Sequence, residues 1–289
     1  MANGRTVVVA GATGRQGGGV ARALLADGWR VLAMTRDPES GKARALAAAG
    51  AEVVKADMDD PASLDAAFAG AHGVYSVQNP MISGLEGEVR QGRNVGDAAR
   101  RAGVRHLVYG SAGTGERGTG IGSWESKLDI EEHLHGLGLP VTVLRPPAFM
   151  EVMTDPAFYP PAGVWHVWPK LTGGSFRASW LSCHDLGVIA AKIFAAPERY
   201  VGQQLELAAD LRTLDECRDI YTRVFGRRPK RFPMPVWLFE RFTPDTVRLW
   251  RWARTEWTEV DPQLARSIHP EAMTVEAWLR RQKAERNPP

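Results

Sequence analysis

The first half of the chain alternates between short apolar runs and longer stretches with helical periodicity. The apolar runs, rich in Val, Leu and Ala, predict buried strands. We expect these strands at Val7–Val9, Arg30–Thr35, Ala51–Ala56, Gly73–Val77, Arg105–Tyr109 and Leu139–Leu144. Strict alternation of strand and helix predicts a doubly wound α/β fold, in which helices cover both faces of a parallel sheet.

This regularity ends at Pro146, after which proline and tryptophan become frequent. We expect residues 1–150 to form a nucleotide-binding domain and residues 151–289 a smaller α+β lobe that also receives chain crossovers from the first domain. In the lobe, short apolar segments predict strands at Val164–Trp168, Phe176–Leu181 and Leu205–Ala208. Helices are expected at Ser182–Phe194, from Thr213 onward, at Trp237–Arg254 and at Val275–Lys283.

The turn after the first strand carries the strongest chemical signal. It reads Gly11-Ala12-Thr13-Gly14-Arg15-Gln16-Gly17, and a helical pattern follows at once. A helix N-terminus offers unpaired N–H groups and the positive end of its dipole, and glycines let the backbone approach a pyrophosphate. A strand before the turn and a helix after it are typical of a Rossmann-type dinucleotide site. The alternative is an ordinary strand-to-helix turn.

The ends of the next strands refine this prediction. Arg36 follows the second strand, where an arginine accommodates a 2′-phosphate and an acidic residue would bind the free ribose. We therefore favour NADP(H) over NAD(H), although Asp37 is adjacent and Arg36 fits a solvated helix start as well. Asp57, after the third strand, is a candidate for the adenine amino group. Asn79, after the fourth, fits a ribose or phosphate contact or a turn before Pro80.

Composition excludes several other classes. The chain has 289 residues, a formal net charge of +3 and 44% hydrophobic residues, which is typical of a soluble globular protein and too weakly basic to indicate a nucleic-acid partner. We expect no membrane segment, no signal peptide and a cytoplasmic location. Cys183 and Cys217 are expected to be reduced and buried. No metal site is predicted, because His133 and His135 would point to different faces of a helix. A basic run from Arg223 to Arg231 fits a solvated turn better than an acidic partner.

Several segments together resemble the NmrA-like family, an atypical branch of the short-chain dehydrogenase/reductase superfamily. They are Gly11–Gly18, Thr35–Pro38, Asp57–Asp60, Glu88–Gly92, Ala102–Val104, Lys127 with Glu131 and Glu132, Arg145–Glu151 and Tyr200–Gln203. The resemblance is greatest to redox-sensor members that bind NADPH. It implies cofactor contacts at the residues from Gly11 to Gly17 and at Arg36, Asp57, Met58, Gln78, Asn79, Lys127, Phe149, Met150 and Glu151. Phe149 or Met150 would lie over the nicotinamide, and packing in the core of the lobe is the alternative for both.

The same resemblance leaves catalysis open. Catalytic members of the superfamily usually carry Tyr-x-x-x-Lys, and here Lys127 is present while Ser123 stands at the tyrosine position. We favour an NADPH-dependent reductase of a small organic substrate such as a quinone or enone, with Lys127 as acid or base and Ser111 orienting the substrate oxygen. The alternative is a non-catalytic redox sensor that binds a regulatory protein. A solvated Lys127 paired with Glu131 is the third possibility, and the chain is expected to be a monomer or homodimer.

Overall fold

The computed structural model describes residues 5–155 and 163–286, which divide into two compact units. Unit 1 comprises residues up to Arg117 together with Gly122–Arg145 and Cys183–Leu205. Unit 2 comprises Gly118–Ile121, Pro146–Ser182 and the residues from Glu206 onward. These two units do not divide the chain at residue 150 as expected, because the segment Cys183–Leu205 belongs to unit 1.

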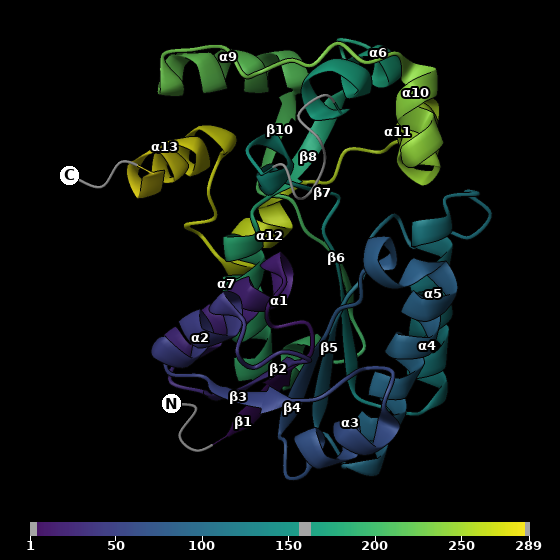
Figure 1. Ribbon diagram of the computed structural model, residues 1–289, viewed down its shortest axis with the longest axis vertical. Helices are drawn as coiled ribbons and strands as arrows, with labels where there is room; N and C mark the ends of the chain where they lie inside the picture. The colour runs from purple at the N-terminus through teal and green to yellow at the C-terminus, as the bar shows by residue number, and fades with distance from the viewer. Residues whose placement is uncertain (1–4, 156–162, 287–289) are drawn as a thin grey trace. The chain divides into compact units, whose positions relative to one another are not determined.

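Unit 1 is a seven-stranded sheet in the order β3-β2-β1-β4-β5-β6-β9, covered by helices on both faces (Figure 1). The pairs from β3 through to β6 are parallel, which confirms the doubly wound α/β fold. The strands are β1 (Thr6–Val9), β2 (Arg30–Thr35), β3 (Glu52–Lys55), β4 (Gly73–Ser76), β5 (His106–Gly110), β6 (Val141–Arg145) and β9 (Gln204–Glu206). The helices are α1 (Arg15–Ala26), α2 (Gly41–Ala48), α3 (Pro61–Phe68), α4 (Pro80–Arg101), α5 (Gly122–Gly136), α7 (Cys183–Ala195) and α8 (Pro197–Tyr200).

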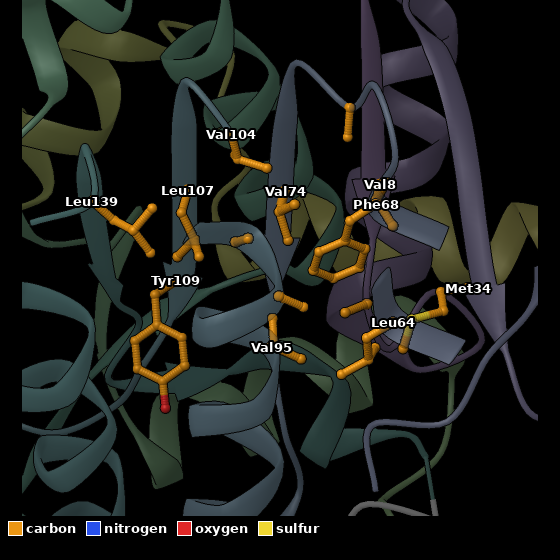
Figure 2. Packing of buried hydrophobic residues seen from close by; sticks show 14 of the residues in the cluster. Val8, Met34, Leu64, Phe68, Val74, Val95, Val104, Leu107, Tyr109 and Leu139 are labelled. Atoms are coloured by element: carbon orange, nitrogen blue, oxygen red, sulfur yellow. The ribbon is translucent and has the colours of Figure 1, made fainter. Parts of the chain in front are cut away.

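Helices α3, α4 and α5 pack on one face of this sheet through a continuous apolar core. Figure 2 shows the strand residues Val8, Val74 and Leu107 in this core, with Phe68 of α3 and Val95 of α4. The remaining face carries α1 and α7, whose backbones meet directly. A Cβ on Gly19 would lie 2.3 Å from the carbonyl oxygen of Cys183, so this helix contact requires glycine.

Unit 2 is built around a small sheet in the order β10-β8-β7. Its strands are β7 (Ala148–Phe149), β8 (Arg177–Leu181) and β10 (Asp210–Thr213). Its helices are the 3₁₀ helix η1 (Met150–Met153), the π-helix η2 (Gly163–Val167), α6 (Trp168–Thr172), α9 (Leu214–Phe225), α10 (Val236–Phe242), α11 (Pro244–Glu256), α12 (Pro262–Ile268) and α13 (Val275–Arg286). Most of the tryptophans that follow Val164 lie in its core. The rings of Trp168 and Trp250 are stacked there, with their centroids 5.1 Å apart.

Three predictions for the second half of the chain need correction. Val164–Trp168 is helical rather than a strand, because its apolar residues pack on all sides in the core of unit 2. The strand predicted at Leu205–Ala208 is β9, and it extends the sheet of unit 1. The helix predicted at Trp237–Arg254 is broken at Thr243, before Pro244. Cys183 and Cys217 are both buried, as expected, and no disulfide joins them.

A buried histidine links β5 to β6. The hydroxyl of Thr142 donates to the carbonyl oxygen of Tyr200 at 2.8 Å, so it accepts from Nε2 of His106, also at 2.8 Å. Burial, with a smaller contribution from the charge of His72, lowers the pKa of His106 to about 4. His106 is therefore neutral in the folded protein near neutral pH.

This burial predicts a loss of stability in mild acid. Between pH 6.5 and about 4 the unfolded chain binds a proton at His106 that the folded chain does not, so stability falls as the pH falls through this window. The loss in unfolding free energy approaches about 3 kcal/mol at the acidic end of this pH window. Urea unfolding of the wild type and of His106→Gln across this range measures it. The variant should lose most of this pH dependence, and an unchanged slope would contradict the assignment.

Candidate functional site

The glycine turn lies at the carboxyl end of β1 and leads directly into α1. Gly11 has a φ of +80°, and a Cβ on Gly17 would lie 2.3 Å from the carbonyl oxygen of Gly11. The amide of Gly14 donates to the same oxygen at 2.9 Å, which closes the turn. Gly14 is the N-cap of α1, where no side chain caps the helix and the first turn holds no acidic residue. The helix start is thus open to an external anion.

The side chains of this turn divide between the core and the surface. Ala12 is buried and Arg15 is exposed. Gln16 accepts a long hydrogen bond, 3.4 Å, from the hydroxyl of Tyr75 on β4. Thr13 is half-buried. The turn therefore presents mainly backbone to a ligand.

Arg36 stands at the carboxyl end of β2, the strand next to β1. Its side chain is exposed and makes no ion pair within residues 5–155 and 163–286. Asp37 is engaged locally, because its carboxylate accepts from the amide of Glu39 at 3.0 Å. The pKa of Asp59 is lowered mainly by a hydrogen bond from Gln91, with smaller contributions from Arg90 and from the charge of Arg36. Arg36 therefore lies at the sheet edge that carries the turn after β3.

The turn after β3 holds two of the predicted contacts. The Asp57 carboxylate accepts from the amide of Asp59 at 3.0 Å, and the Met58 carbonyl accepts from the Asn94 side chain at 2.9 Å. Both residues are half-buried. They are held in place by their own neighbours, and Met58 also contacts the next predicted residue, Gln78, through its sulfur at 3.7 Å.

Gln78 and Asn79 follow β4 and have different roles. The Gln78 amide nitrogen donates to the Ser76 hydroxyl at 2.9 Å, while its Oε1 is buried and has no partner in the described part of the chain. Such an orphaned acceptor requires a donor from a ligand or water. Asn79 caps α4, because its Oδ1 accepts from the amide of Met81 at 2.9 Å.

Ser111 lies just beyond β5 in a buried polar network. Its hydroxyl donates to Oε1 of Glu131 at 2.5 Å, and Arg145 pairs with the other oxygen of that carboxylate. Arg145 also donates to Gln204 at 2.7 Å. Because the single hydroxyl proton of Ser111 is used by Glu131, the oxygen is left to accept a hydrogen bond.

Lys127 pairs with Glu88 and not with Glu131. Its Nζ lies 2.7 Å from Oε1 of Glu88 on α4, and the Ser126 hydroxyl donates to the other Glu88 oxygen at 2.5 Å. Glu88 is fully buried and the Lys127 side chain is 9% exposed. The reading of Lys127 as a solvated lysine paired with Glu131 is therefore wrong.

Tyr109, near the end of β5, is a tyrosine that lies outside the Tyr-x-x-x-Lys pattern. Its hydroxyl is buried and has no partner among residues 5–155 and 163–286. Burial, together with the negative charges of Glu88 and Glu131, raises its pKa well above 10.0. Tyr109 therefore stays protonated and inaccessible, and it does not replace the tyrosine missing at Ser123.

The three predicted residues of unit 2 follow one another at the end of β7. Phe149 is 9% exposed and Met150 is completely buried in the unit 2 core beside Trp165 and Trp180. Glu151 is half-buried in η1. The core-packing alternative for Met150 is thus what the structure shows.

A groove of about 720 Å³ lies between α4 and α5 of unit 1. None of the predicted cofactor residues lines this groove, and its walls carry both acidic and basic side chains. In the described ranges, no cluster of His, Cys, Asp and Glu is arranged to hold a metal ion. Nor do these ranges contain a helix that combines the length and apolar character needed to cross a bilayer.

Comparison with known proteins decides the family, since residues 3–259 match the model of the NmrA-like family. The chain belongs to the NmrA-like family. It is 34% identical over 258 residues to the NmrA-like family domain-containing oxidoreductase FrzB of Cladobotryum sp, an alignment that spans 80% of this chain and 77% of FrzB.

Solved structures share the fold of this NmrA-like chain. NmrA, a negative transcriptional regulator, aligns over 98% of both chains with a TM-score of 0.79 and 20% identity. NmrA has also been solved in complex with NAD and with NADP. The Citrobacter sp. triphenylmethane reductase complexed with NADP(H) aligns over 96% of this chain and 99% of its own, with a TM-score of 0.75 and 22% identity.

The buried Glu131–Arg145 pair gives a stability prediction. Glu131→Gln leaves the Arg145 guanidinium without a counter-charge in the interior, and we expect a loss of about 3 kcal/mol in unfolding free energy. The matched control is Glu132→Gln, one residue further along α5. The Glu132 side chain is 79% exposed, and its carboxylate pairs with Arg117 at the surface. Denaturant unfolding compares the two, and equal losses would show that the buried pair is not the determinant.

Proposed function

We propose that this NmrA-like chain binds NADP(H) in unit 1 and uses NADPH to reduce a small organic substrate such as a quinone or enone. The proposal rests on the uncapped start of α1 behind a glycine turn and on Arg36 at the end of the adjacent strand, which forms no ion pair within residues 5–155 and 163–286. The curated relative FrzB, named an oxidoreductase, supports the reductive activity.

The residues at this sheet edge fit the chemical groups of a dinucleotide phosphate. The turn from Gly11 to Gly17 would hold the pyrophosphate, because the start of α1 has no side-chain cap and the turn packs so closely that a Cβ at Gly17 would collide with its own backbone. Arg36 would bind the 2′-phosphate through its guanidinium. Asp57 and Met58 would contact the adenine, and the orphaned Oε1 of Gln78 would accept from a cofactor hydroxyl or amide.

The bound nicotinamide supplies a hydride, and the chain supplies the polar groups around it. Lys127 has N–H donors beyond the one that Glu88 takes, so it would donate to a ribose hydroxyl or a substrate oxygen. Ser111 would accept from a donor on the ligand rather than protonate it, because Glu131 holds its proton. A quinone or enone oxygen carries no proton to donate, so this geometry does not support the expected role of Ser111 in orienting a substrate oxygen.

The alternative is a redox sensor that binds NADP(H) without turnover and regulates a protein partner. Ser123 in place of the usual tyrosine favours it, as does the similarity in fold to the regulator NmrA. NADPH oxidation in the presence of quinones and enones separates the two functions. Turnover supports the reductase, and cofactor binding without turnover supports the sensor.

Cofactor preference gives the first test of this proposal. Arg36→Ala removes the guanidinium that would bind the 2′-phosphate, so NADPH affinity should fall about tenfold or more while NADH affinity stays the same. Titration calorimetry measures both. Arg44→Ala, an exposed arginine on neighbouring α2 that lies 3.7 Å from Glu39, is the control and should leave both affinities unchanged. Equal wild-type affinities for the two cofactors would refute the preference.

The role of Lys127 gives the second test. Removing Lys127 alone would leave Glu88 buried and unpaired, so we use the double variant Glu88→Gln with Lys127→Met. With quinone as substrate, kcat should fall about a hundredfold while NADPH affinity changes by only a few fold. Glu88→Gln alone, which keeps the amine, is the control and should retain more of the activity. A double variant as active as the wild type would exclude Lys127 from the reaction.

A further inference from the structure

Unit 2 carries a concentrated positive surface on the connector between α9 and α10. Arg227, Arg228, Lys230 and Arg231 are all exposed, and none of them forms an ion pair with any residue that the structure describes. The nearby acid Glu240 is already bound by two nitrogens of Arg251, at 2.6 and 2.9 Å. The connector therefore keeps its full positive charge.

Exposed aromatic rings follow these cations directly. Phe232 is 62% exposed, Trp237 69% and Phe242 73%. Among the described residues these are the large exposed aromatics of the whole chain, and all three fall between residues 232 and 242. Three exposed aromatic rings within one short segment of a folded protein favour an interaction site over random surface composition.

A second segment of unit 2 brings further positive charge to the same place. Lys170 lies 2.9 Å from the ring of His166, and its charge and that of Arg231 both lower the pKa of His166, after the larger effect of burial. Arg231 of the connector thus lies near two basic side chains of η2 and α6. Since neither Lys170 nor Arg231 pairs with a carboxylate in the part of the chain that the structure describes, their charges favour an external anion.

We propose that this surface, formed by Arg227, Arg228, Lys230, Arg231, Phe232, Trp237 and Phe242, binds an acidic peptide segment of another protein that also carries apolar side chains. Arginines bind carboxylates through paired hydrogen bonds, and exposed tryptophan and phenylalanine receive the apolar residues. Pro229, Pro233 and Pro235 favour an extended connector, along which an extended peptide can run in contact with several cations.

The helix geometry favours a peptide over a membrane surface. Trp237 and Phe242 are five positions apart on α10, so they project about 140° from one another around the helix axis. A flat lipid surface contacts one of these rings at a time, whereas a peptide that wraps around α10 contacts both. The formal net charge of only +3 likewise provides little general attraction for nucleic acid.

Fluorescence anisotropy of a labelled peptide that alternates Glu and Leu tests the proposal on the full chain. We expect saturable binding that is lost when every Glu is replaced by Gln and that weakens about tenfold in Arg227→Glu/Arg228→Glu. Trp237→Ala should weaken it as well. The control Arg100→Glu/Arg254→Glu reverses two exposed arginines, on α4 and α11, and should bind like the wild type.

Two competing ligands are measured beside the peptide. Vesicles of phosphatidylcholine with phosphatidylserine and a single-stranded oligonucleotide should bind more weakly than the peptide. No peptide binding, equal binding by the control and the Arg227→Glu/Arg228→Glu variant, or tighter binding of vesicles or oligonucleotide would overturn the proposal. NADPH titration of the same variants should be unchanged, so the outcome is independent of the cofactor proposal.

Discussion

The close approach of backbones around α1 is the constraint on which unit 1 depends. At the start of the helix, Gly17 lies against the carbonyl of Gly11, and two residues further on Gly19 lies against Cys183 of α7. Neither contact leaves room for a Cβ. Because α1 is fixed by backbone on both sides, its N-terminus is held at the carboxyl edge of the sheet, where parallel α/β folds bind their ligands. The open start of α1 is thus a consequence of how the helix packs.

Two buried ion pairs provide the polar side chains beside this edge. Glu88 with Lys127 and Glu131 with Arg145 place two negative and two positive charges in the interior, each paired at hydrogen-bond distance. Such pairs cost desolvation, so they contribute specificity of arrangement more than stability. At the proposed site they would leave two kinds of group for a ligand, namely the remaining protons of Lys127 and the lone pairs of Ser111. A site with one donor and one acceptor held rigidly suits recognition of a small polar ligand.

Local signals in the sequence predicted the parts of this fold that local physics determines. The glycine turn and the strand at Arg30–Thr35 depend on neighbouring residues, and both are present in the structure. The helix expected from Thr213 onward is α9, and it begins with a capping box between Thr213 and Glu216, which is also a local interaction. In contrast, Lys127 and Glu88 lie on different helices, so helical spacing pointed to Glu131 instead. The strand predicted at Val164–Trp168 is wrong for a related reason, because a segment whose apolar residues are buried on every side shows neither helix nor strand periodicity.

A crystal structure of the chain grown with NADP⁺ shows whether the open N-terminus of α1 holds the pyrophosphate of the cofactor. We expect density for the pyrophosphate at the amides of the Gly11–Gly17 turn and for the 2′-phosphate at the Arg36 guanidinium. Cofactor bound elsewhere on the chain, or a pyrophosphate placed away from this turn, would contradict this expectation.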